Sequence, residues 1–226
     1  MQRTLVLAVE TDWFVSMLNN NKRVIAAGII GNIVEYYDFA LIGFMAVIMG
    51  ELFFPSDNHF LSLLGSFGAF AAGMIMRPIG AGIFGHIGDK VGRRFALMAS
   101  LVMMALPTLL IGFLPTYATI GIAAPILLVL LRMLQGLSVG GEYASSIVYL
   151  VEQAPMEHKN LYGSFVSVGA KIGMALGAGF SGALFWYLGD ETMREWGWRV
   201  PFIFSVVIAA AGVYLRKNLT DNYEVE

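Results

Sequence analysis

Six long apolar stretches constrain this chain more than any other feature of its sequence. They cover roughly residues 24–49, 60–85, 95–115, 121–150, 161–188 and 200–216. A helix needs about 20 mostly apolar residues to cross the hydrocarbon core of a bilayer, and each stretch approaches or exceeds that length. Only 13% of the residues are charged, against about a quarter in soluble domains. The sequence therefore predicts an all-α integral membrane protein with six transmembrane helices.

The connections between the spans carry most of the charges. One side is predicted to hold nearly all the basic residues: Arg3, Lys22, Arg23, Lys90, Arg93, Arg94, Lys159, Arg216 and Lys217. The other side holds only Arg194 and Arg199. Because Lys and Arg are enriched in cytoplasmic loops, both chain ends are expected in the cytoplasm. The third and fourth spans are separated least clearly, since only a short uncharged turn, LPTYAT, lies between them.

The predicted division has three parts: an N-terminal cytoplasmic segment over 1–21, a six-helix transmembrane domain over 22–217 and a cytoplasmic tail over 218–226. No secretory signal is expected, because Glu10 and Asp12 interrupt the short apolar run after Arg3. The true start is either Met1 or Met17, where MLNNNKRV leads directly into the first span. Residues 1–16 are then either part of the protein or a mis-assigned start.

Composition argues against several classes of function. The net charge of −2 provides no basic surface for nucleic acid. The chain has no cysteine, so it forms neither a disulfide nor a thiolate metal site. The spacing of His59, His86 and His158 does not suit metal ligation, and we expect no metal and no cofactor. The sequence lacks the nucleophile–base arrangement that would indicate an enzyme. It also lacks the repeated filter loop that would indicate a channel.

Six ionisable residues interrupt the apolar spans: Glu35, Asp38, Arg77, Arg132, Glu142 and Lys171. Insertion scales assign about 2.5–3.5 kcal/mol to such a residue at the bilayer centre, hence roughly 15–20 kcal/mol for all six unpaired. We therefore expect these three acids and three bases to be paired or hydrated in a cavity. Ion pairs that only lock helices together are the alternative to a functional role.

Helical spacing groups these residues into polar stripes. Glu35 and Asp38 are three residues apart, so they share one face of the first span. Two further stripes are Arg132, Gln135, Val139 and Glu142 in the fourth span, and Ser164, Ser167 and Lys171 in the fifth. The three stripes are expected to face one another or water rather than lipid.

This arrangement predicts a proton and substrate cavity. Two neighbouring carboxylates in a poorly solvated site raise each other's affinity for protons, so Glu35 or Asp38 can exchange a proton near neutral pH. Lys171 is the predicted counter-charge or dock for an anionic substrate, with a structural role as the alternative. The predicted cavity set is Glu35, Tyr36, Asp38, Arg132, Gln135, Glu142 and Lys171. Close helix packing is expected along three glycines of the fifth span: Gly169, Gly173 and Gly177.

Five segments between residues 22 and 217 resemble those of a known family. GHIGDKVGRR resembles the G-x-x-x-D-x-x-G-R-R/K loop of the major facilitator superfamily, with matches at Gly85, Asp89, Gly92, Arg93 and Arg94. RMLQG, which starts at Arg132, resembles the R-x-x-Q-G motif of the same superfamily. GNIVEYYDF, RPIGA and WGWRVPF narrow the resemblance to the metabolite:proton symporters, which include proline/betaine, α-ketoglutarate, citrate and shikimate carriers. This chain has Glu-Tyr-Tyr-Asp where that family usually has Glu-Trp-Tyr-Asp.

The resemblance implies one half of a twelve-helix fold in the inner membrane. Its implied activity is uptake of a small polar metabolite, such as a carboxylate, proline or betaine, with protons and by alternating access. The resemblance places Glu35, Asp38 and Arg132 along the central cavity, and Asp89 with Arg93 at a cytoplasmic gate. Six spans then imply a truncated or split product, a separately made second half, or a homodimer. A non-transporting remnant or assembly partner is the alternative, and the sequence does not identify the metabolite.

Overall fold

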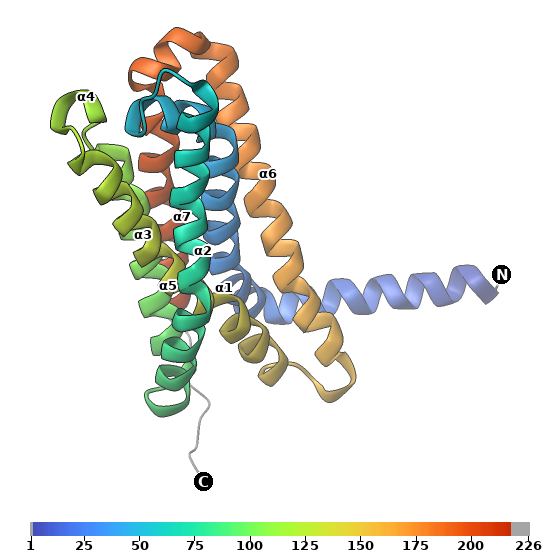
Figure 1. Ribbon diagram of the computed structural model, residues 1–226. Helices are drawn as coiled ribbons and strands as arrows, with labels where there is room; N and C mark the ends of the chain where they lie inside the picture. The colour runs from blue at the N-terminus through green and yellow to red at the C-terminus, as the bar shows by residue number, and fades with distance from the viewer. Residues whose placement is uncertain (1, 218–226) are drawn as a thin grey trace.

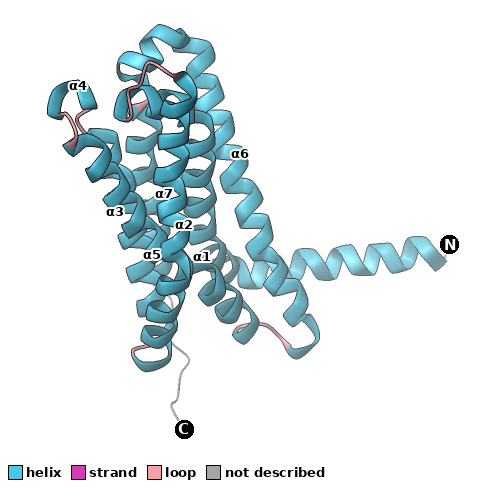
Figure 2. Cartoon of the chain, viewed as in Figure 1, coloured by secondary structure: helices cyan, strands magenta, loops and turns pink. Residues whose placement is uncertain are grey.

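The computed structural model describes the backbone of residues 2–217 and the side chains of residues 24–92 and 94–217. The helices in chain order are α1 (Gln2–Phe53), α2 (His59–Lys90), α3 (Arg93–Phe113), α4 (Tyr117–Ile120), α5 (Ala123–Glu152), the 3₁₀ turn η1 (Met156–His158), α6 (Lys159–Thr192), the π-helical turn η2 (Met193–Gly197) and α7 (Arg199–Lys217). Figure 2 shows these helices joined by short loops. The predicted tail, 218–226, lies outside the described residues.

Six helices of the described chain are long and apolar enough to cross a membrane: α1 from Val24, α2, α3, α5, α6 and α7. They stand side by side as an antiparallel bundle, while the N-terminal part of α1 projects sideways from it (Figure 1). Many large apolar side chains point outward, including those of Phe60, Ile75 and Ile126. The prediction of an all-α, six-span membrane protein is confirmed.

The two ends of the bundle differ in charge as the sequence predicts. The α2–α3 turn, the α5–α6 connection and the end of α7 lie at one end, and the other connections lie at the opposite end (Figure 1). Lys90, Lys159 and Lys217 belong to the first end, whereas Arg194 and Arg199 belong to the second. Which end faces the cytoplasm stays a prediction.

The connection between the second and third spans is much shorter than expected. Helix α2 continues to Lys90 and α3 begins at Arg93, so Val91 and Gly92 alone interrupt the helices. Gly92 adopts φ 120°, a conformation that side chains disfavour, and it makes the sharp turn possible. Gly85 lies inside α2 instead. Polar residues at a helix end keep their helical hydrogen bonds beyond the apolar segment, which is why hydropathy alone placed this boundary too early.

Glycine faces bring the helices of the bundle close together. A Cβ atom at Gly169 would lie 2.9 Å from the carbonyl oxygen of Ile29, and one at Gly177 would lie 2.7 Å from that of Tyr37. The predicted packing role of the α6 glycines is therefore confirmed, and their partner is α1. Between α2 and α5, Gly136 packs directly on the backbone of Gly73. The α2–α5 contact places these two helices side by side, and residues of both line a cavity together with residues of α1.

The apolar core at one end of the bundle is built around aromatic residues. The rings of Phe53 and Trp198 pack edge to face at 5.7 Å, and Phe202 continues the cluster. The Tyr37 hydroxyl donates a hydrogen bond of 2.9 Å to the carbonyl of Pro201. Tyr37 is thus a packing residue that joins α1 to α7, whereas the adjacent Tyr36 does not belong to this cluster.

Candidate functional site

Two neighbouring cavities lie between α1, α2 and α5, near the middle of the bundle. The larger measures about 430 Å³ and is open to the outside of the described chain, and the smaller, about 20 Å³, has room for roughly one water molecule. Four residues line both cavities: Glu35, Met74, Arg77 and Val139. The larger one is also lined by Tyr36 and Tyr143, and the smaller one by Asp38, Arg132 and Gln135.

Asp38 is the centre of a buried hydrogen-bond cluster. Arg132 donates to Asp38 Oδ2 at 2.9 Å, and Gln135 donates to Asp38 Oδ1 at 3.1 Å. Thr108 of α3 adds a longer hydrogen bond of 3.3 Å to the same Oδ1. Arg132 also donates to the Gln135 side-chain oxygen at 2.8 Å. Three donors therefore satisfy this carboxylate and tie α1, α3 and α5 together.

Glu35 is held far less completely than Asp38. Its Oε1 lies 3.4 Å from Nη1 of Arg77, whose side chain is 28% exposed. Its Oε2 is buried and has no hydrogen-bond partner among the described side chains and backbone. The Arg77 guanidinium also lies over the ring of Phe39, at 5.8 Å from the ring centre. This carboxyl thus has one weak partner and one free oxygen.

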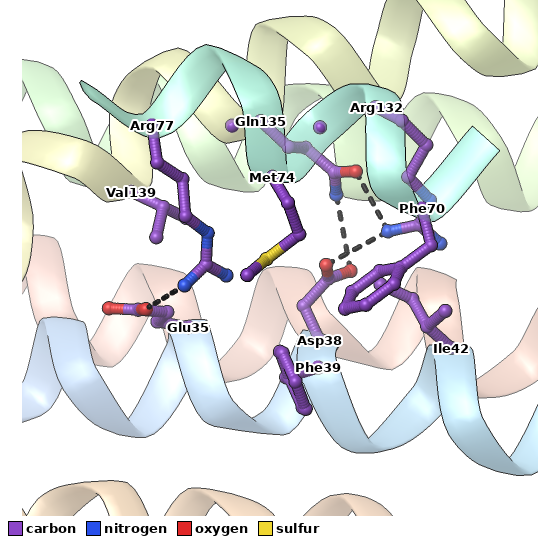
Figure 3. A pocket seen from close by; sticks show the side chains of 12 residues that line it. Glu35, Asp38, Phe39, Ile42, Phe70, Met74, Arg77, Arg132, Gln135 and Val139 are labelled. Carbon is purple, nitrogen blue, oxygen red and sulfur yellow. Dashed lines mark hydrogen bonds and ion pairs between the residues drawn. The ribbon is translucent and has the colours of Figure 1, made fainter. Parts of the chain in front are cut away.

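Figure 3 shows how the two acids are separated. Both project from α1 toward α2 and α5, and the Met74 side chain lies between the Glu35–Arg77 pair and the Asp38 cluster. The rings of Phe39 and Phe70 pack edge to face at 5.2 Å beside Asp38. The predicted stripes of the first and fourth spans therefore do meet, through the ion pair of Asp38 with Arg132, whereas Glu35 pairs with Arg77 of α2.

Glu142, the last residue of the predicted α5 stripe, lies outside both cavities. It pairs with Arg216 of α7 and accepts hydrogen bonds from Ser100 at 2.6 Å and Ser146 at 3.1 Å. Arg216 is completely buried, with 0% exposure, so its assignment to a basic loop is wrong. Its charge is compensated inside the bundle because Glu142 and backbone carbonyls of α1 and α3 surround the guanidinium.

The third predicted stripe does not join the other two. Ser164, Ser167 and Lys171 are exposed on α6, on the side opposite the face that contacts α1. Lys171 is two residues from both Gly169 and Gly173, which places it about 200° around the helix from each of them. The glycine face of α6 needs the close contact with α1, and this turns Lys171 outward. A role of Lys171 in substrate binding stays a prediction.

The loop residues of the predicted gate lie at the α2–α3 turn. Asp89 is exposed near the end of α2, and Arg94 donates a hydrogen bond to the carbonyl of Lys217 at the end of α7. The Arg93 side chain lies outside the described residues. This end of the bundle therefore links α3 with α7, and a gating role stays a prediction.

Sequence reasoning missed three functional candidates. Thr108 lies eight residues after Ser100, so the sequence already placed these two polar side chains near one face of α3. Arg216 continues a stripe of small residues from Ser205 through Gly212, which is the face of α7 that becomes buried. Tyr143 follows Glu142 directly and had no signal of its own. Within the described residues no group of three His, Asp or Glu side chains could hold a metal ion.

Comparison with known proteins finds a matching family and several relatives. Residues 24–220 match the model of a family described as sugar (and other) transporter. An inner membrane metabolite transport protein of Escherichia coli K12 is 44% identical over 206 residues, covering 91% of this chain and 47% of the relative. A shikimate transporter of the same organism is 39% identical, with 92% and 48% covered. A proline/betaine transporter of Salmonella typhimurium is 38% identical, with 88% and 40% covered. The chain thus spans about half the length of these relatives.

Solved structures show the same fold. A D-xylose–proton symporter superposes with a TM-score of 0.76 at 18% identity, covering 88% of this chain and 48% of the other. An inward-open xylose transporter of E. coli gives a TM-score of 0.75 at 18% identity, with 88% and 47% covered. The six described spans therefore correspond to about half of a major facilitator structure, as the sequence predicts.

Proposed function

Because this chain belongs to the family of sugar and other transporters, within the major facilitator superfamily, we propose that its six spans form one side of the pathway of a proton-coupled symporter. It is a multi-pass membrane protein, and its family consists of transporters rather than enzymes. The proposed cellular location is the inner membrane, with both chain ends in the cytoplasm. A second six-helix half, or a second copy of the chain, supplies the opposite side of the pathway.

The observation that carries this proposal is the unequal pairing of two acids beside one cavity. A carboxyl that exchanges protons must be tolerable in both its neutral and its charged form. Glu35 meets this condition, since one oxygen faces Arg77 and the other is free to hold a proton. Asp38 differs, because both of its oxygens already accept hydrogen bonds, three in total. We therefore assign the proton to Glu35 and a substrate-linked role to the Asp38 cluster.

The Asp38 cluster has the properties of a substrate-responsive latch. Its guanidinium and amide groups line the smaller cavity and hold α1, α3 and α5 together. A polar metabolite that accepts hydrogen bonds from Arg132 would compete with Asp38 for the same donors. The substrate would then bind with different affinity to the conformation in which Asp38 holds Arg132 and to the one in which it does not. Such a difference in affinity is required for a ligand to shift a conformational equilibrium.

The substrate class is a small polar metabolite with a carboxylate. Guanidinium groups such as those of Arg77 and Arg132 bind carboxylates in two-point geometry. The named relatives carry proline, betaine or shikimate, all within this class. Lys171 remains a proposed contact for an anionic substrate, on the side of α6 that faces away from α1. Asp89 and Arg93 are proposed to control the cytoplasmic gate.

Uptake assays test the proposal. Vesicles with an imposed proton gradient are supplied with labelled proline, betaine, shikimate or a dicarboxylate, using the chain alone and the chain joined to the second half of the 44% identical E. coli relative. We expect proton-driven accumulation of one of these in the completed transporter. Asp38→Asn should lower it by roughly 10- to 100-fold, the effect of losing one hydrogen bond between charged groups, with Asp57→Asn in an exposed loop as the matched control. Folded protein without accumulation in either form would show a non-transporting role, such as that of an assembly partner.

A further inference from the structure

Asn32 combines complete burial with a side chain that makes no hydrogen bond. It is 0% exposed, and neither Oδ1 nor Nδ2 finds a partner in the described part of the chain. It lies three residues before Glu35, so the two side chains share a face of α1. The free oxygen of Glu35, Oε2, is buried as well. Three polar atoms without partners are therefore gathered within one helical turn.

Leaving such atoms without partners is expensive. Each buried donor or acceptor that lacks a hydrogen bond costs about 1–3 kcal/mol. Natural proteins usually solve this with an internal water, which makes about three hydrogen bonds to polar groups. Glu35 Oε2 together with the two polar atoms of Asn32 offers one such water three partners. A direct hydrogen bond from a protonated Glu35 to Asn32 is the competing arrangement.

The surroundings of Asn32 on α1 are charged on two sides. The preceding residue, Gly31, packs directly against the carboxylate of Glu142 and the guanidinium of Arg216. On the other side, Glu35 contacts Arg77 at the cavity, and Asp38 with Arg132 follows one turn further. Glu142 is saturated by its donors and Asp38 accepts three hydrogen bonds, whereas Glu35 retains an open position. A proton delivered to this region therefore finds its acceptor at Glu35.

We propose that Asn32 and the free oxygen of Glu35 bind an internal water, through which Glu35 gains and loses its proton. The transfer breaks the O–H bond at Glu35 Oε2 and forms one at the water, which passes one of its own protons to a neighbouring water. Glu35 is left as a carboxylate paired with Arg77, and the bound water is unchanged. Asn32 is thus a positioning residue that acts through the water. The inference rests on the proposed proton role of Glu35.

Infrared spectroscopy of the chain in lipid nanodiscs tests the water site without any transport measurement. Exchange into ¹⁸O-labelled water should reveal the O–H band of an internal water in the unmodified protein. Asn32→Leu, which keeps the shape and removes both polar atoms, should abolish this band and shift the carboxyl C=O band that Glu35→Gln identifies as that of Glu35. Asn32→Ala removes the same atoms where leucine prevents folding. Ser181→Ala is the matched control, since Ser181 is also completely buried and without a partner within the described residues.

A second measurement separates this inference from the proposed function. In the completed transporter, Asn32→Leu should slow proton-driven accumulation by roughly 10- to 100-fold, while exchange of labelled for unlabelled substrate changes less than about twofold. An unchanged water band and Glu35 carboxyl band in Asn32→Leu would overturn the inference, as would the absence of the water band from the unmodified protein. Absence of all transport in the unmodified, folded protein would overturn the proposed function while the spectroscopic result still decides the water site.

Discussion

Two acid–arginine pairs of the same chemistry lie in this bundle in very different surroundings. Glu142 and Arg216 are fully hydrogen-bonded: two serines donate to the carboxylate, and all three guanidinium nitrogens donate to it or to two backbone carbonyls, at 3.0 Å and 2.5 Å. Glu35 and Arg77 are joined by a single contact of 3.4 Å beside an open cavity, with one carboxyl oxygen unpartnered among the described residues. The same two residue types thus occupy two different environments.

The difference lies in how many hydrogen-bonding positions each site leaves open. A buried charge whose donors and acceptors are all satisfied is locked in one state, because any change exposes an uncompensated charge. A charge with an open position can change its partner or its protonation state at a lower cost. The Glu142–Arg216 cluster therefore holds α1, α3, α5 and α7 as one unit, whereas the Glu35–Arg77 pair keeps the open position that the proposed proton exchange requires.

The strongest test of this contrast is removal of one charge from the Glu142–Arg216 cluster. Arg216→Met should destabilise the folded chain by about 3–5 kcal/mol, because it leaves Glu142 buried and unpaired. Equilibrium unfolding in a detergent titration measures the loss. The double variant Arg216→Met, Glu142→Leu should recover most of it, since no charge is then left alone. A loss below about 1 kcal/mol for the single variant would show that the cluster does not hold these four helices together.

A smaller perturbation reaches the same cluster without changing any charge. Gly31→Ala would place a Cβ atom on the Glu142 carboxylate and the Arg216 guanidinium, so these groups or α1 must shift. We expect a loss of about 1–3 kcal/mol, typical of overpacking. Gly43→Ala on the same helix is the matched control, since no described atom lies within 4 Å of its Cβ position. Equal unfolding curves for the two variants would contradict a tight cluster.

Removal of the acid from the open pair should change stability less and function more. Glu35→Gln breaks one long contact with a partly exposed arginine, so the expected change in stability is within about 1 kcal/mol. The glutamine side chain does not take up a proton at the pH of an uptake assay. Accumulation driven by a proton gradient should therefore be lost while substrate exchange persists. Uptake measured across a pH series checks this. Retained pH-dependent accumulation would move the proton to another residue, with Asp38 as the first candidate.

The smallest effect on stability is expected at Lys171. It is exposed on α6, and its substitution by alanine should change the free energy of unfolding by less than about 0.5 kcal/mol. If Lys171 contacts substrate, Lys171→Ala should weaken uptake of an anionic metabolite more than that of a zwitterion such as betaine. Competition between the two labelled substrates measures this. Equal loss for both would instead indicate a packing contact with the second half.

Much of the architecture could be predicted because it depends on local properties. Length and apolarity determine a spanning helix, and they located all six. The four-residue repeat of Gly169, Gly173 and Gly177 determined a close-packing face. The three-residue spacing of Glu35 and Asp38 placed them on one side of α1, where the cavities lie. Each of these inferences needs only the geometry of a single helix and the cost of placing polar atoms in lipid.

Tertiary structure alone decided which helix faces contact each other and which charged residues pair. The sequence of α6 offers two faces on opposite sides, and the glycine face packs against α1 while Lys171 points outward. Arg216 reads as an ordinary basic residue at the end of a span, yet the order of the helices places it against Glu142, 74 residues earlier. Periodicity fixes directions around one helix axis, but pairing depends on the rotation and position of all the helices together. That is why the charges could be listed from the sequence and their partners could not.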